Sequence, residues 1–242
     1  MPTSLDAVVA ELAPRGTLRV AINFGNPVLA QPDPATGAPR GVSADLASEL
    51  ARRLNVALQF KTYDAAGKVF ADADQDAWDL AFMAIDPLRA EKVDFTQPYV
   101  IIEGTYLVRS DSALTSVDEV DRPGLRVGVG KGAAYDLYLT RTLQHAEIVR
   151  APTSAGAIDL FIEQSLDAAA GVRQPLEAYA ADHEGLRVID GRFTAIEQAM
   201  ATPRGGDASR PYLESFIADA KASGFVAAAL QRSGQQAATV AP

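Results

Sequence analysis

Short apolar segments alternate along the chain with longer segments whose apolar residues recur at helical spacing. This alternation limits the possible folds more than any other feature. The first cycle has a strand-like segment at 16–22, a helix-like segment at 43–54 and a second strand-like segment at 56–61. Leucines recur every four residues in the helix-like segment, which places them on one helix face. Such alternation predicts βαβ units and a mainly parallel sheet flanked by helices.

The same alternation begins again after residue 108, and two series of similar size predict two lobes. Residues 1–108 with 194–242 are expected to form lobe I, and residues 109–193 to form lobe II. Ser43 is a candidate N-cap for the first long helix. The remaining expected elements are strands at 79–83, 125–129, 147–151, 166–171 and 186–189 and helices at 65–73, 134–142, 154–164, 175–181, 210–223 and 225–233.

Charge and composition exclude several classes of function. The net charge of −9 over 242 residues argues against nucleic acid or an anionic membrane surface as a partner. There is no cysteine, which excludes disulfides and thiolate metal sites. The two histidines, His145 and His183, lack the spacing of a metal site. We expect neither a metal nor a cofactor, and no apolar run approaches the ~18 residues that a membrane span needs.

The segment 78–108 contains a strand, a polar break at Asp86-Pro87 and an arginine, Arg89. The end of a strand supplies backbone N–H groups, and a guanidinium is a planar double donor that matches a carboxylate. This arrangement predicts an anion site. The residues alone leave a second interpretation equally open, in which Arg89 lies on the loop surface and pairs with Glu91 or Asp94.

A longer pattern in this segment favours the anion site. Asp79-Leu80, Arg89, Val93-Asp94-Phe95-Thr96 and Pro98-Tyr99 match a motif in register, and the segment resembles the amino-acid type of extracellular solute-binding proteins, family 3. These are the two-lobed binding subunits of ABC importers. The resemblance spans nearly the whole chain and implies a type II periplasmic-binding-protein fold. It also implies a ligand cleft between the lobes, hinge crossings near Val108 and Phe193, and a ligand carboxylate bound by Arg89.

Ligands of α/β proteins gather at the carboxyl ends of strands, which nominates further binding residues. They come from four loops, each of which follows a predicted strand. With Arg89, the predicted ligand-binding residues are Asn23, Phe24, Asn26, Met83, Ala84, Lys131, Ala133, Ala134, Tyr135, Arg173 and Gln174.

Departures from the family pattern bear on the ligand. The family places an acidic residue for the ligand's ammonium group where this chain has Val172 or Arg173, and a threonine where it has Ala84. A second arginine facing the ligand would favour a dicarboxylate or an amine-free acid over a standard amino acid. In the alternative that stays open, Arg173 points outward at the start of a helix.

The function expected from the resemblance is binding of a small carboxylate for an ABC importer, by a monomer that closes on its ligand. A descendant enzyme of the cyclohexadienyl dehydratase kind, or a cytoplasmic sensor, is the alternative. In the enzyme, Glu103 and Asp86 would be the proton-transfer residues. Glu103 lies in an apolar run where burial would raise its pKa, unless it is paired with an arginine or lysine.

Residues 1–12 lack the basic start and apolar core of a signal peptide. The expected location is periplasmic or extracellular if a signal peptide was removed, and cytoplasmic otherwise.

Overall fold

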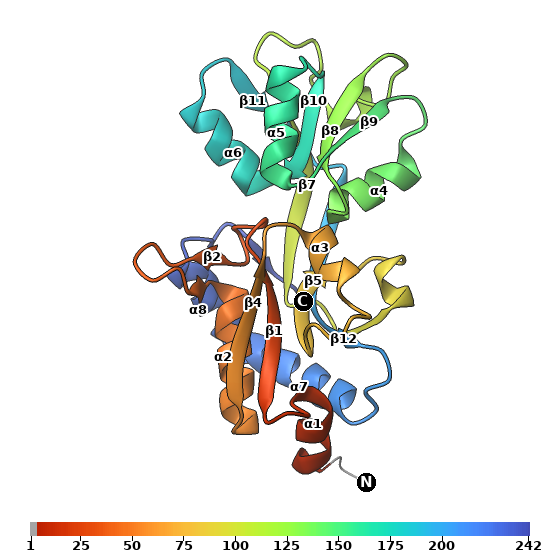
Figure 1. Cartoon of the computed structure of the whole chain (residues 1–242). Coiled ribbons are helices and arrows are strands. Elements are labelled where there is room, and N and C mark those ends of the chain that lie inside the picture. Colours follow the sequence, from red (N-terminus) through yellow and green to blue (C-terminus); the bar gives the residue numbers. More distant parts are fainter. Residues whose placement is uncertain (1–3) are drawn as a thin grey trace. The chain divides into compact units, whose positions relative to one another are not determined.

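The computed structural model describes residues 4–242, which divide into two compact units (Figure 1). The first unit contains residues 4–63, 68–101 and 197–242, and the second contains 64–67 and 102–196. The chain leaves the first unit within strand β7 (Val100–Arg109) and returns within β12 (Thr194–Pro203). The predicted lobe boundaries at 108/109 and 193/194 stay a prediction. Within residues 4–242, no helix has both the length and the apolarity to cross a bilayer.

The first unit is built on three parallel strands in the order β4, β1, β5. β5 is buried at every residue, which explains its continuous apolar sequence. Strand β12 pairs antiparallel with β5, and Gln198 lies opposite Ala84. The strands of this unit are β1 (Thr17–Asn23), β2 (Gln31–Pro32), β3 (Pro39–Arg40), β4 (Ala57–Tyr63), β5 (Leu80–Ala84), β6 (Val93–Phe95) and β13 (Thr239–Val240). Its helices are α1 (Leu5–Leu12), α2 (Val42–Leu54), α7 (Ser209–Ala222) and α8 (Phe225–Arg232), and α3 (Ala66–Ala71) lies across the boundary of the two units.

The start of α2 differs from the prediction. Gly41 is the N-cap with φ 110°, and a Cβ at this position would lie 2.7 Å from the carbonyl oxygen of Leu29. Only glycine fits such a backbone conformation and such a close approach. Ser43 lies inside the helix, where its Oγ is 3.1 Å from the Tyr99 hydroxyl. The prediction that Ser43 caps the helix is therefore wrong, because its hydroxyl bonds a distant tyrosine in the core.

The second unit has the parallel order β9, β8, β10, with β7 antiparallel to β10 and β11 antiparallel to β7. Phe161, Leu166 and Leu176 are fully buried in its core. The predicted mainly parallel sheets flanked by helices are confirmed. The further elements are β8 (Arg126–Gly130), β9 (Glu147–Ala151), β10 (Ala168–Val172), β11 (Leu186–Val188), α4 (Ala134–Thr142), α5 (Ser154–Glu163) and α6 (Arg173–Asp182).

One carboxylate arrangement occurs in both units. In the first, Asp79 Oδ2 accepts a 2.9 Å hydrogen bond from the backbone N–H of Arg19, and the Asp79 N–H donates to the Arg19 carbonyl at 2.8 Å. In the second, Asp167 and Arg126 make the same two bonds, at 2.7 and 3.0 Å. Each aspartate precedes the third strand of a βαβαβ series and binds the beginning of the first strand. The pair thus aligns two neighbouring parallel strands.

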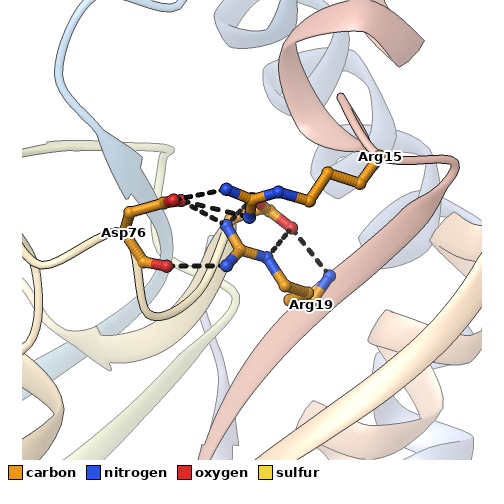
Figure 2. A network of polar contacts seen from close by, with 4 residues as sticks. Arg15, Arg19 and Asp76 are labelled. Atoms are coloured by element: carbon orange, nitrogen blue, oxygen red, sulfur yellow. Dashed lines mark hydrogen bonds and ion pairs between the residues drawn. The ribbon is translucent and has the colours of Figure 1, made fainter.

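The Arg19 side chain extends the arrangement in the first unit. Its guanidinium lies between Asp79, at 2.6 Å, and Asp76, at 2.7 Å, and Arg15 binds Asp76 from the end of the α1 segment (Figure 2). The hydrogen bond with Asp79 is the main cause of the raised pKa of Arg19. Asp79 is 8% exposed, whereas the Asp76 side chain is 66% exposed. Most of the stabilisation should therefore come from Asp79, because solvent screens the Asp76 pairs.

Replacing Asp79 with alanine should lower the free energy of unfolding by about 2–4 kcal/mol, because it leaves a half-buried guanidinium and a strand N–H without their shared acceptor. Urea unfolding measures the change. Asp76→Ala is the matched control and should cost much less. Equal losses in the two variants would contradict the assignment.

Candidate functional site

Arg89 lies at the end of the loop 85–88 that follows β5, in a single 3₁₀ turn (Arg89–Glu91). Its side chain is buried, with 1% exposed, and Nη1 donates to the Ala84 carbonyl at 3.0 Å. Burial lowers the pKa of Arg89 to about 10, against a smaller opposing effect of the Asp86 charge. The guanidinium therefore stays protonated at neutral pH. The alternative that Arg89 lies on the loop surface is wrong.

Asp86 shapes the loop that carries Arg89. Its Oδ1 accepts the Leu88 N–H at 2.9 Å, and its carbonyl accepts the Ala90 N–H at 2.9 Å. This is a side-chain turn that winds the chain into the 3₁₀ helix. Ile85 and Leu88, on either side of Asp86-Pro87, are exposed by 38% and 45%. The loop thus combines a fixed buried cation with apolar side chains at its surface.

Gln198 is a candidate that the sequence analysis missed. It is 4% exposed and lies opposite Ala84 on β12, and directly paired residues present their side chains on the same face of a sheet. A single amide in the segment 196–201, whose other residues are apolar except for Glu197, was the available signal. No motif includes it, and only the strand register places it beside the end of β5.

The loop after β1 contains Asn23, Phe24 and Asn26, all half-buried. Asn23 Oδ1 accepts the Gly25 N–H at 2.9 Å, and the Phe24 N–H donates to the Tyr63 carbonyl at 2.8 Å. Asn26 Oδ1 is buried and has no hydrogen-bond partner. Since β1 and β5 are parallel neighbours, this loop leaves the same sheet edge as the loop of Arg89.

In the second unit, the turn from β8 to α4 contains four predicted residues. Ala133 is the helix N-cap and makes no side-chain cap bond, and Lys131 is exposed. Tyr135 is 3% exposed and its hydroxyl donates to Ser154 Oγ at 2.8 Å, while burial raises the pKa of Tyr135. Ala134, the first helical residue, is half-buried. The buried Asp136 carboxylate accepts the N–H of the glycine in this turn at 2.8 Å and fixes its conformation.

Arg173, the first residue of α6, is held within the second unit. Its Nε donates to Glu103 Oε2 at 2.7 Å, and further N–H groups contact Glu177 at 3.5 Å and the Gly191 carbonyl. Glu103 Oε1 accepts a second bond from Arg192 at 3.0 Å. These bonds join β7, α6 and the segment before β12. The guanidinium is thus neither an outward-pointing surface group nor a cation without an anion.

The same contacts determine the charge of Glu103. The hydrogen bond from Arg173 is the main effect, and with Arg192 it lowers the pKa of Glu103 although partial burial opposes this. The expected rise of this pKa is wrong, and the alternative of pairing with arginine is confirmed.

Gln174, next along α6, has a buried Oε1 that lacks a hydrogen-bond partner. In this unit β8 and β10 are parallel neighbours, so their loops also leave one sheet edge.

Comparison with known proteins identifies the family and the fold. Residues 18–236 match the sequence model of the bacterial extracellular solute-binding proteins, family 3. The L-cystine-binding protein of Escherichia coli (strain K12) is 28% identical over 146 residues, which cover 59% of this chain and 54% of that protein. The chain thus matches about half the length of this curated relative.

Solved structures, including the following two, resemble nearly the whole chain. An ancestral amino acid-binding protein, described as a precursor of cyclohexadienyl dehydratase, is 26% identical with a TM-score of 0.77, and the match covers 94% of this chain and 98% of that chain. An amino acid ABC transporter substrate-binding protein from Streptococcus pneumoniae, bound to L-arginine, is 19% identical with a TM-score of 0.79, and the match covers 97% and 99%. The predicted type II periplasmic-binding-protein fold is confirmed.

Glu103→Gln should lower the melting temperature at pH 7, because the variant loses the charge that binds two arginines. The pKa of Glu103 is lowered from 4.5 in the folded state, so its stabilisation is complete above 4.5 and is lost as the pH falls through the folded-state pKa. The difference between the variant and the wild type should therefore shrink below pH 4.5. Thermal unfolding from pH 3 to 7 measures it. A difference that is independent of pH would contradict a charged Glu103.

Proposed function

Because the chain belongs to the bacterial extracellular solute-binding proteins of family 3, we propose that it binds a small carboxylate ligand through Arg89. The observation that carries this proposal is the environment of Arg89. Its guanidinium is buried at a strand end, stays charged, and is held by the Ala84 carbonyl. A cation held in this way needs little reorganisation to bind a carboxylate, and both charge and shape favour that ligand.

The finer part of the proposal concerns the ligand's other functional groups, beside the carboxylate that Arg89 would bind. The absence of an acid at Val172 and Arg173, and of a hydroxyl at Ala84, supports an amine-free or dicarboxylic acid. Arg173 supports this choice less than its charge suggests, since Glu103 already binds it at 2.7 Å. The preference for an amine-free acid therefore stays a prediction, and a standard amino acid is the competing ligand.

The proposed partners follow from the family. A monomer would deliver its ligand to the membrane subunits of an ABC importer, on the outer side of the cytoplasmic membrane. Members of the matched family are described as extracellular, which supports that location. The ligands of the relatives, L-cystine and L-arginine, bring amino acids into the set of compounds to be tested.

An enzyme on the same fold is the second candidate. The likeness to an ancestral precursor of cyclohexadienyl dehydratase favours it. The state of Glu103 argues against a role as proton donor, since two arginines keep this carboxylate charged and leave no proton to donate at neutral pH. Incubation with prephenate and arogenate separates the two functions. Product formation that Asp86→Asn abolishes would support the enzyme, and binding without conversion would support the binder.

A carboxylate ligand at a concentration of about 100 times its Kd should raise the free energy of unfolding by about 2.7 kcal/mol. This corresponds to a rise of the melting temperature by about 5–10 °C. Thermal-shift measurements on amino acids, dicarboxylates and amine-free acids test this. Arg89→Lys keeps the charge but not the planar pair of donors, so it should lose most of the shift. Arg89→Ala should lose all of it. A shift that survives in both folded variants would contradict Arg89 as the anchor.

A further inference from the structure

Asn26 has a buried polar atom that the fold does not explain. Its Oδ1 has no hydrogen-bond partner, although buried amide oxygens are nearly always paired. Leaving an acceptor buried and unpaired costs stability, and a hydrogen bond from a bound molecule would recover that cost.

The backbone of the loop around Asn26 is hydrogen-bonded, and the residues that follow Asn26 are packed. The Asn26 carbonyl accepts the N–H groups of Leu29 and Ala30 at 3.1 and 3.3 Å. Leu29 and Ala30 are buried, and so is Val28. The Asn23 side chain adds a further hydrogen bond to this turn, from the Gly25 N–H at 2.9 Å. The backbone of the turn is thus hydrogen-bonded within the chain, whereas the side-chain oxygen of Asn26 has no partner there.

The strand register places this loop beside the proposed anchor. Ala21 of β1 is paired with Ala81 of β5, so the two strands end next to each other. Neighbouring strands lie about 4.8 Å apart. Asn26 follows the end of β1 and Arg89 follows the end of β5, at the same edge of the first unit's sheet. One small molecule bound by Arg89 can therefore reach both loops.

We infer that Asn26 is a specificity-determining residue, whose Oδ1 accepts a hydrogen bond from an N–H or O–H group of the carboxylate ligand. This inference rests on the proposed function and narrows its ligand class to carboxylic acids that carry a hydrogen-bond donor. A site with a buried acceptor binds an analogue that lacks the hydrogen-bond donor more weakly. The bound analogue excludes water from the acceptor and leaves it without a hydrogen bond. An ammonium group and a hydroxyl group both meet the requirement.

Two series of acids with equal carbon skeletons test it. Succinate, malate and aspartate differ in having no donor, a hydroxyl or an ammonium group. Butyrate, 2-hydroxybutyrate and 2-aminobutyrate form the same series with one carboxylate. Calorimetry on the wild type should give at least one donor-bearing acid that binds about tenfold tighter than its donor-free relative, which corresponds to about 1.4 kcal/mol. The stronger of the hydroxyl and ammonium compounds identifies the donor.

Two variants assign the preference to Asn26. Asn26→Leu keeps the size of the side chain but removes the acceptor, so the donor-bearing and donor-free acids should bind within about twofold of each other. Without ligand, this variant should melt at a higher temperature than the wild type, since a buried unpaired oxygen is gone. Asn26→Asp keeps an acceptor and should restore the preference, with ammonium favoured over hydroxyl.

The results separate this inference from the proposed function. Binding that requires Arg89 but does not distinguish the members of a series overturns the role of Asn26 and leaves the carboxylate proposal intact. A preference that persists in a folded Asn26→Leu variant also overturns it. Failure of the wild type to bind any of the six acids counts against both.

Discussion

In each unit, the carboxylate of one aspartate connects the amino ends of two neighbouring parallel strands. Asp79 binds the N–H of Arg19, and Asp167 binds the N–H of Arg126. Each bond fixes the relative position of two parallel strands at their amino ends. Because the strands are fixed at their amino ends, the loops at their carboxyl ends begin at defined positions. These loops contain Asn26 and Arg89 in the first unit and Tyr135 in the second. The positions of the candidate binding residues thus depend on a contact at the far edge of the sheet.

The pKa values of the two most informative charged residues, Arg89 and Glu103, are both lowered, but for different physical reasons. Arg89 is buried, and the loss of water lowers its pKa toward 10 without discharging it. Glu103 is only partly buried and has two arginine neighbours, so its pKa falls where apolar surroundings suggested a rise. The balance between desolvation and a charged partner decides each case. A partner 70 residues away in the chain, such as Arg173 for Glu103, is decisive.

Most of the fold could be predicted from the sequence. The helix at 134–142 and the strand at 147–151 have the predicted bounds, because alternating periodicity and glycine turns are local signals. Ser43 shows the limit, since its hydroxyl bonds Tyr99, whose position depends on the whole unit. Gln198 could not be chosen as a site candidate, because only strand register places it next to Ala84. The local sequence predicts neither which residues pair with Glu103 nor that the side-chain oxygen of Asn26 is buried without a partner.

The discontinuity of the first unit has a consequence for the order in which the protein is made. Residues 102–196 form nearly all of the second unit as one uninterrupted stretch, whereas the first unit needs residues 197–242 to complete its sheet and its helical cover. During synthesis, the second unit therefore leaves the ribosome whole while β5 still lacks its antiparallel neighbour β12. The apolar edge of β5 stays exposed for that interval. A chain that ends between residues 196 and 203 and has left the ribosome would thus carry a complete second unit and an unprotected strand in the first, the kind of edge from which aggregation and chaperone binding begin.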